Sequence, residues 1–256
     1  MVKMKNKYIT QGFLGFCVMI LPLLFGGCAS LPDEGQFTYS AQDPWHNTNR
    51  KIYAFNKTID NTLLLPATRA YSAVIPDPVE QAVTNIFNNL AEVQYFANHL
   101  LQGKLLQASN DAGRLLINST IGVVGLFDVA AYFGMCAQPE DFGQTLGYWG
   151  VEAGPYMVLP LLGPSSVRDG ASLLVDQQFD PLSSYQPGDH RLRLQVLQVL
   201  DMRNQLQDLQ QLVIGDEYMF VRDAYLARRA MQVRDGRPVN NMASEADEFD
   251  EFDEFD

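Results

Sequence analysis

The chain lacks the residue patterns on which most enzymes and metalloproteins depend. It has only three histidines, His46, His99 and His190, far apart and without His-Glu-x-x-His spacing, and no Cys-x-x-Cys pair. Each histidine is expected at the surface or at a helix end. We find no Gly-x-Ser-x-Gly turn for a serine nucleophile and no Gly-x-x-x-x-Gly-Lys loop for a nucleotide phosphate. These absences predict a protein that is not an enzyme and needs no metal or cofactor.

Positive charge is also scarce. The chain has 18 lysines and arginines against 30 aspartates and glutamates, and its formal net charge is −12. Eight of the acidic residues lie in the last twelve positions, residues 245–256. This balance argues against nucleic acid as a partner and against an electrostatic attachment to anionic lipid surfaces.

The segment between Arg114 and Arg168 is nearly free of charge. It contains only four charged residues together with eight glycines and four prolines, so it cannot be one uninterrupted apolar helix. Irregular backbone at membrane depth is tolerated only where it is buried in protein or lines a cavity. The segment alone allows two interpretations: protein that works in or against lipid, and the buried centre of a soluble domain.

The N-terminus has the features of an export signal. Three lysines in the first seven residues precede an apolar run from Tyr8 to Phe25, and two glycines then precede Cys28. A basic start, an apolar stretch and small residues before a cleavage point are typical of a secretory signal. The glycines before Cys28 resemble a bacterial lipobox, so residues 1–27 are predicted to be removed and Cys28 to be lipidated. An uncleaved membrane anchor is the alternative.

The cysteines agree with lipidation. Cys17 would leave with the signal and Cys28 would carry lipid, so Cys136 stands alone and no intramolecular disulfide is expected. We predict that Cys136 is a small buried apolar residue. Residues 28–42 are predicted to be the lipidated tether, whose three acyl chains exceed the roughly two signals needed for stable anchoring.

The secondary-structure signals after the tether are helical. Asp43-Pro44 is typical of an N-cap followed by proline, and Pro66 predicts the end of that helix. Residues 77–80 match a capping box, and Gly103 predicts where the second helix ends.

Later apolar residues recur at steps of three and four. They predict a helix from Leu105, a long one from Leu192 to Gly215, and a last one capped by Asp216. Because no stretch alternates with period two, the chain is predicted to be all-α, with a single domain over residues 43–236.

The central segment is similar to a known family. Residues 141–151 read Asp-Phe-Gly-Gln-Thr-Leu-Gly-Tyr-Trp-Gly-Val and continue through Gly154-Pro155 to Arg168-Asp169. This succession resembles the MlaA (VacJ) family of outer-membrane lipoproteins. Asn49-Arg50 with Phe55-Asn56 falls in family order, and the resemblance covers roughly residues 43 to 235.

The resemblance implies a function in lipid transport. Members are helical rings embedded in the inner leaflet of the outer membrane, associated with trimeric porins on the periplasmic side. An amphipathic channel takes phospholipid that has strayed into the outer leaflet and passes it to a soluble periplasmic lipid-binding protein, which maintains lipid asymmetry. A membrane-anchored phospholipase and a structural porin-associated lipoprotein are the alternatives.

Six residues are candidates for the lipid channel or a hinge beside it. They are Phe55, Asn56, Gly147, Gly150, Gly154 and Pro155. Because glycine tolerates a wide range of backbone angles, Gly150 and Gly154 are predicted to flex, with close packing or helix capping as the alternative. The Phe55-Asn56 pair is predicted to close or seat the channel, with helix-face packing as the alternative.

The last segment, residues 237–256, is predicted to be a disordered acidic tail. It ends in a threefold Glu-Phe-Asp repeat, in which like charges repel one another. Its phenylalanines recur every three residues, a spacing that neither a helix nor a strand presents on one face. A contact with a basic patch on the periplasmic carrier and a purely solubilising role are both open.

Overall fold

The computed structural model describes residues 43–206, 213 and 215–236. The predicted signal (1–27), the tether (28–42) with Cys28, and the acidic tail (237–256) lie outside these residues. So does part of the predicted helix from Leu192 to Gly215.

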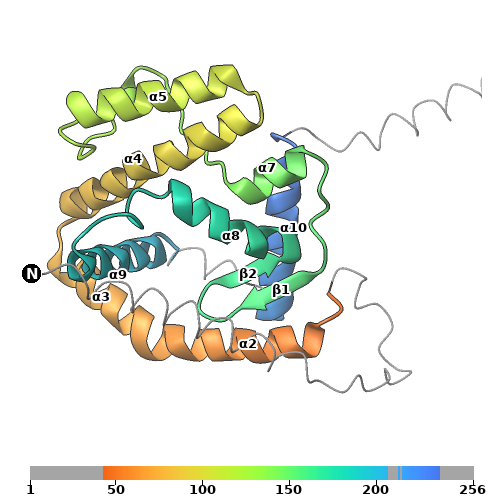
Figure 1. The fold of residues 1–256 in the computed structure, drawn as a ribbon. Coiled ribbons are helices and arrows are strands. Elements are labelled where there is room, and N and C mark those ends of the chain that lie inside the picture. Colours follow the sequence, from red (N-terminus) through yellow and green to blue (C-terminus); the bar gives the residue numbers. More distant parts are fainter. Residues whose placement is uncertain (1–42, 207–212, 214, 237–256) are drawn as a thin grey trace, which may run out of the picture. The chain divides into compact units, whose positions relative to one another are not determined.

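The first helical run continues past Pro66, where the sequence predicted its end. α2 (His46–Ile59) passes directly into a π-helical turn, η2 (Asp60–Leu64), and then into α3 (Leu65–Val74) (Figure 1). Within this wider turn the Leu65 amide donates to the Asp60 carbonyl, five residues earlier. Pro66 has no amide hydrogen, and it lies directly after this wider turn, at the start of α3. The prediction of a helix end at Pro66 was therefore wrong.

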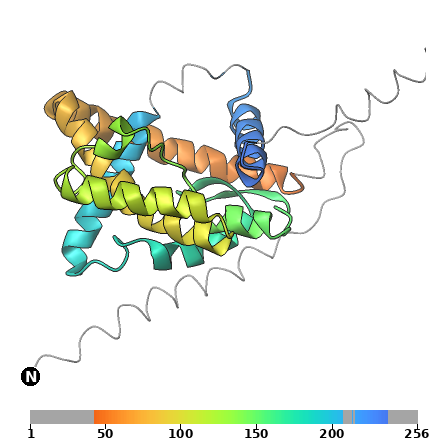
Figure 2. The same ribbon diagram turned by 90° about the horizontal axis from the view of Figure 1, so that it is seen from above.

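α4 (Asp77–Leu101) and α5 (Leu105–Thr120) form a helical pair that packs side by side (Figures 1 and 2). Gly103 joins them with a φ of +72°, which glycine adopts without strain. The predicted end at Gly103 and start at Leu105 are confirmed. α4 begins one residue earlier than predicted, with Pro76 in the capping position.

A short hairpin is the only sheet among the described residues. β1 (Tyr156–Leu159) pairs antiparallel with β2 (Gly163–Ser166), with Tyr156 opposite Ser166 and Leu159 opposite Gly163. Neither strand was predicted from the sequence, because four-residue strands are too short for alternation to stand out. Helices otherwise supply the regular structure, so the predicted all-α class is confirmed.

The remaining helices complete the fold. They are α6 (Val129–Tyr132), α7 (Phe142–Tyr148), α8 (Val167–Phe179), α9 (Gly188–Gln205) and α10 (Glu217–Val233). α7 packs against α8 and α10, and α9 packs against α3 and α4. Asp216 caps α10 as predicted, because its Oδ1 accepts a hydrogen bond of 3.1 Å from the Met219 amide. α8 was not predicted.

The apolar core is a small cluster between β1 and α10. It consists of Tyr156, Val158 and Tyr218, with partly buried neighbours on α2 and α10. Asp43 lies buried beside it and accepts hydrogen bonds from Tyr218 Oη (2.6 Å) and Asn49 Nδ2 (2.8 Å). Asp43 therefore joins the start of α2 to α10. It is not the predicted N-cap, a position that Trp45 occupies.

Candidate functional site

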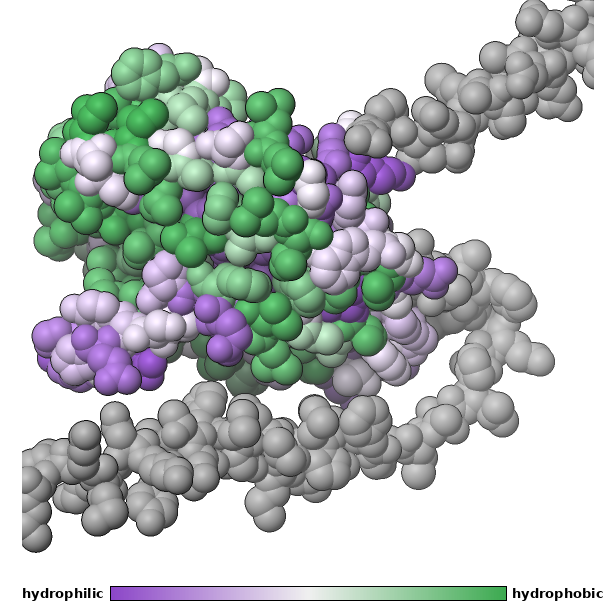
Figure 3. Space-filling model, turned by 45° about the horizontal axis from the view of Figure 1, so that its top comes forward, coloured by the Kyte–Doolittle hydropathy of each residue, from purple (hydrophilic) through white to green (hydrophobic). Residues whose placement is uncertain are grey.

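The polarity of this structure is inverted relative to an ordinary soluble domain. Among the described residues, 23 buried residues are polar or charged and only seven are hydrophobic. At the same time 32 large hydrophobic residues are exposed. Hydrophobic residues dominate the part of the surface that α4 and α5 form (Figure 3). Charged side chains are rarely buried in water-soluble proteins unless they are paired, so the interior has to be held by specific polar contacts.

One such set of contacts centres on Arg114 of α5. Its Nε donates to Glu92 of α4 at 2.5 Å, its Nη1 to the Met135 carbonyl at 2.5 Å, and its Nη2 to Asp128 at 3.1 Å. Arg114 and Glu92 are both almost completely buried. The guanidinium therefore ties the α4–α5 pair to the segment that follows it.

A second set joins α7, α8 and α10. Arg229 Nη1 donates to Asp141 at 2.6 Å, while Arg229 Nε and Tyr225 Oη both donate to Asp169, at 2.9 and 2.6 Å. Burial acts to raise the pKa of Asp169, but the hydrogen bonds from Arg229 and Tyr225 outweigh burial and lower the pKa to about 2. Asp169 is therefore a permanent negative charge held between three helices.

The predicted pair Phe55-Asn56 lies on α2 beside the hairpin, and its two residues differ in their contacts. Phe55 is 51% exposed. The Asn56 side chain donates to the Leu159 carbonyl (2.9 Å) and accepts from the Leu161 amide (2.8 Å). Asn56 thus holds the turn between β1 and β2.

A second asparagine on α2 repeats this contact at the other end of β1. Asn49 lies seven residues before Asn56, which is close to two helical turns. It accepts from the Val158 amide (3.0 Å) and donates to the Tyr156 carbonyl (3.2 Å). The two side-chain amides satisfy the free edge of β1 in place of a third strand. This role of Asn49 was not predicted from the sequence, although its spacing from Asn56 was a usable signal.

Of the residues predicted for the channel or hinge, Gly150, Gly154 and Pro155 lie in the connection from α7 to β1, and Gly147 lies in the last turn of α7. Gly150 and Gly154 have φ values of +90° and +68°, which strain other residues. A Cβ on Gly147 would lie 2.7 Å from Arg168 Nη1 and 2.8 Å from Val233 Cγ1, so Gly147 permits close packing. The Pro155 carbonyl accepts from the Val167 amide at 3.2 Å. The structure brings this connection and Asn56 to opposite ends of β1; a hinge stays a prediction.

A cavity of about 360 Å³ lies between α4, α7 and α10. Its charged lining residues are Glu140, Asp141, Arg228 and Arg229, and its other walls include tyrosines, glutamines, Ala91 and Pro139. The adjacent carboxylates have separate partners: Glu140 precedes α7 and accepts from Gln102, whereas Asp141 caps α7 and binds Arg229. Both face the same amphipathic hollow.

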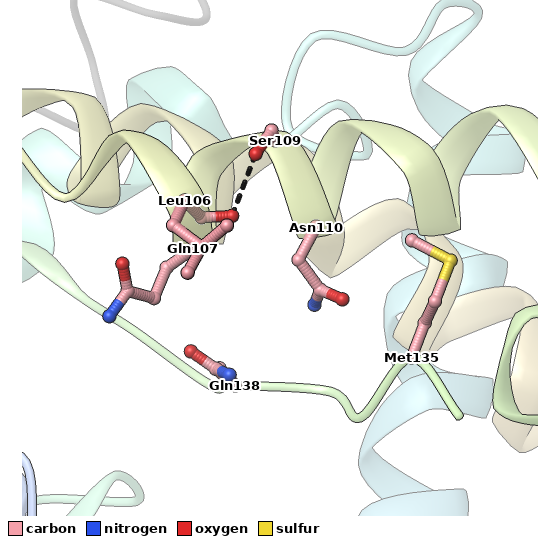
Figure 4. Close-up of a pocket in the computed structure, with 6 residues that line it drawn as sticks. All are labelled: Leu106, Gln107, Ser109, Asn110, Met135 and Gln138. Atoms are coloured by element: carbon pink, nitrogen blue, oxygen red, sulfur yellow. Dashed lines mark hydrogen bonds between the residues drawn. The ribbon is translucent and has the colours of Figure 1, made fainter. Parts of the chain in front are cut away.

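A second cavity, of about 440 Å³, carries no charged side chain. It lies between α5 and the segment after α6, and Leu106, Gln107, Ser109, Asn110, Met135 and Gln138 line it (Figure 4). The amides and the apolar side chains share the same opening, and Asn110 Nδ2 also donates to the Cys136 carbonyl at 2.9 Å. This cavity is therefore amphipathic but electrically neutral.

The prediction that Cys136 is buried was wrong. Cys136 is exposed, because its segment runs along the surface of α5. His99 lies in the last turn of α4, one of the two places expected for it, and it is buried there with its Nδ1 2.5 Å from Asp111 on α5. The described residues contain no group of acidic, histidine or cysteine side chains arranged to hold a metal. In the same part of the chain, no helix combines the length and apolar character needed to cross a membrane.

Comparisons with known proteins agree on one family. The family model for the MlaA lipoprotein matches residues 41–232. The Intermembrane phospholipid transport system lipoprotein MlaA of Escherichia coli is 31% identical over 231 residues, which cover 87% of this chain and 90% of that protein. The protein of the same name from Haemophilus influenzae is 30% identical over 252 residues, or 95% and 97% of the two chains.

A solved structure leads to the same conclusion. It comes from work on the structural basis for maintenance of bacterial outer membrane lipid asymmetry, and it matches with a TM-score of 0.66 and 30% identity. The match covers 75% of this chain and 98% of the other. The chain therefore belongs to the MlaA lipoprotein family.

Proposed function

We propose that this protein removes mislocalised phospholipid from the outer leaflet of the outer membrane and passes it to a soluble periplasmic lipid-binding protein. It does so as a lipoprotein anchored through Cys28, embedded as a helical ring in the inner leaflet and associated with a trimeric porin. It works as a passage and carries out no reaction of its own. The resemblance to MlaA relatives supports the transport step.

The observation that carries this proposal is the inverted polarity. Moving a phospholipid requires apolar surface for the acyl chains and polar surface for the headgroup. Exposed hydrophobic residues are numerous on α5 and on the segment that follows it up to Phe133, while buried ions and amides lie inside. A large exposed apolar surface indicates that a protein binds a partner or a membrane there. A phospholipid matches both the exposed apolar surface and the polar interior.

The proposal is tested in the bacterium that makes the protein. Removing the gene is expected to increase the outer-leaflet phospholipid that an externally added phospholipase can reach, and the intact chain is expected to restore the low level. Unchanged lipid accessibility after removal would contradict transport. Radiolabelled lipid should also appear on the periplasmic carrier, whereas release of free fatty acid would favour the phospholipase alternative.

The hinge is tested with two glycine variants. Gly150 has open space where a Cβ would be but a φ of +90°, so Gly150→Pro forces a different backbone while Gly150→Ala keeps the side chain small. We expect Gly150→Pro to block lipid removal with folding and membrane placement intact, and Gly150→Ala to have a smaller effect. Normal lipid removal by Gly150→Pro would show that the glycine serves only the local turn.

Lipidation is tested by mass spectrometry of the membrane-extracted protein. The chain is expected to begin at Cys28 and to carry acyl chains. An unmodified Cys28 or a retained segment 1–27 would contradict the anchor.

A further inference from the structure

The charged side chains around the cavity between α4, α7 and α10 differ in how far they are already paired with other charged groups. Asp141 and Arg229 are paired with each other at 2.6 Å, and Arg229 also contacts Asp169 at 2.9 Å. These two side chains therefore have little capacity left for a ligand. The other two charged lining residues, Arg228 and Glu140, are different.

Arg228 provides a free cation at this cavity. It is exposed, and no hydrogen bond or ion pair links it to the described part of the chain. A guanidinium presents its N–H donors as a planar fork that matches two phosphate oxygens. Arg228 is thus suited to bind a phosphate without giving up an existing contact.

Glu140 provides the opposite charge. It is 7% exposed, and its Oε1 accepts from Gln102 Nε2 at 2.6 Å and lies 3.6 Å from Lys104 Nζ. No hydrogen bond from the described residues reaches Oε2. Burial raises the pKa of Glu140, although Gln102 and Lys104 act to lower it. An additional cation would stabilise the charged carboxylate.

The uncharged walls suit the remainder of a small amphipathic group. Tyr95 and Tyr225 line the cavity with Ala91 and Pro139. Tyrosine rings attract ammonium groups, and apolar side chains pack against methylene groups. The volume of about 360 Å³ lies within the range of roughly 300 to 1,000 Å³ that is usual for small-ligand pockets.

We propose that this cavity binds a zwitterionic headgroup of the phosphoethanolamine class, with its phosphate on Arg228 and its ammonium group at Glu140. The inference rests on the proposed phospholipid transport and names a preference within it. The four charged lining side chains carry two positive and two negative charges. Equal numbers of both signs favour a zwitterion over an anionic phosphoglycerol headgroup.

The test uses the full-length lipoprotein in a nonionic detergent with a fluorescent phosphatidylethanolamine as the bound probe. Glycerophosphoethanolamine is expected to displace the probe at lower concentration than glycerophosphoglycerol or inorganic phosphate. Arg228→Gln should weaken probe binding roughly tenfold or more, as expected for loss of a charge-assisted contact, and Arg228→Lys should weaken it less. Glu140→Gln should reduce the preference for the phosphoethanolamine compound.

Two matched controls are available in the same chain. Arg193→Gln removes an exposed arginine on α9, and Gln138→Ala alters the neutral cavity; neither should change probe binding. If the Glu140→Gln variant does not fold, probe binding by the Arg228 variants alone tests the inference. Arg228 is exposed, so its replacement leaves the interior intact.

Three results would overturn the inference. They are equal displacement by glycerophosphoglycerol, equal displacement by inorganic phosphate, and probe binding by Arg228→Gln that equals that of Arg193→Gln. These outcomes are separate from failure of the transport proposal. If removal of the gene leaves lipid accessibility unchanged, transport fails; if accessibility rises but no headgroup preference exists, only the headgroup site fails.

Discussion

At the scale of single residues, the buried charges decide what a substitution does. Arg114 and Glu92 face each other in the interior, where neither can be hydrated. Removing one member of a buried ion pair leaves the other uncompensated, which is more destabilising than replacing both. The same reasoning applies to each of the polar contact sets that hold α4, α5, α7 and α10 together.

Arg114→Met is therefore expected to lower the free energy of unfolding by about 3–5 kcal/mol, because Glu92 stays buried without a cation. The double variant Arg114→Met with Glu92→Gln should recover part of this loss. Thermal unfolding in detergent measures both, with Arg193→Met as an exposed control. A double variant that is less stable than Arg114→Met would contradict this account.

The buried carboxyl group of Asp176 on α8 is expected to make the stability of the fold depend on pH. Burial raises its pKa from the ordinary 3.8 to about 6, with the Phe142 amide opposing and the Asp141 charge adding to the rise. Between about pH 4 and pH 6 the folded chain holds a proton that the unfolded chain has lost, so this group's contribution to stability falls as pH rises through that window. Asp169 acts in the opposite sense: its lowered pKa stabilises the fold above about pH 4, and that stabilisation is lost as pH falls towards 2.

Asp176→Asn is expected to flatten the pH dependence between pH 4 and pH 6 and to stabilise the fold at pH 7, on the order of 1–3 kcal/mol. The amide oxygen of asparagine can still accept from the Phe142 amide and from Gln94 Nε2, as Asp176 Oδ1 does at 2.9 and 3.0 Å. Unfolding curves at several pH values measure this effect. Asp189→Asn, an exposed change on α9, should leave the pH profile unaltered.

At the scale of secondary-structure elements, the hairpin depends on side chains of α2. Among the described residues β2 is the one strand beside β1, and Asn49 and Asn56 supply hydrogen bonds at the other edge of β1. A two-stranded hairpin is marginally stable by itself, so these amides fix where the hairpin lies. The connection that contains Gly150 and Gly154 is attached to the same hairpin.

Asn56→Ala is expected to speed hydrogen exchange at the Leu161 amide, which would lose its 2.8 Å acceptor. Phe55→Ala changes the neighbouring, half-exposed residue and should leave that exchange rate unchanged. Exchange measured by mass spectrometry on peptides spanning residues 156–166 makes the comparison. If both variants accelerate exchange equally, the pair acts through helix packing and not through Asn56.

At the scale of the whole molecule, the exposed hydrophobic surface is predicted to contact lipid directly. Leu116 on α5 is 65% exposed, so Leu116→Lys should barely change stability in detergent. In a chain that also carries Cys28→Ser, and so has no acyl anchor, Leu116→Lys is expected to reduce flotation with phospholipid vesicles. Ser109→Lys, which adds the same charge at an exposed polar position of α5, should reduce it less. Equal loss in both variants would assign the effect to charge alone.

Features that depend on residues near one another in the chain were predictable from the sequence alone. Proline and aspartate at helix starts, glycine at helix ends and apolar residues at steps of three and four predicted α4, α5 and α10, because capping and helix formation are local. The succession in residues 141–169 identified the family, which the comparisons confirm. The continuous helical segment through Pro66 was not predicted, because a π-helical turn has no simple sequence pattern.

Which polar residues lie inside depends on contacts that form only in the folded chain. Asn56 meets Leu161 across 105 positions of the chain, and Arg229 meets Asp141 across 88. A polar residue is buried only where a partner satisfies it, and that partner comes from a distant element. From the sequence, an arginine within a helical pattern is therefore predicted to be exposed. It can be buried only where folding brings a carboxylate partner from a distant element. The same dependence on distant residues explains why the cavity beside Arg228 and Glu140 could not be predicted from the sequence.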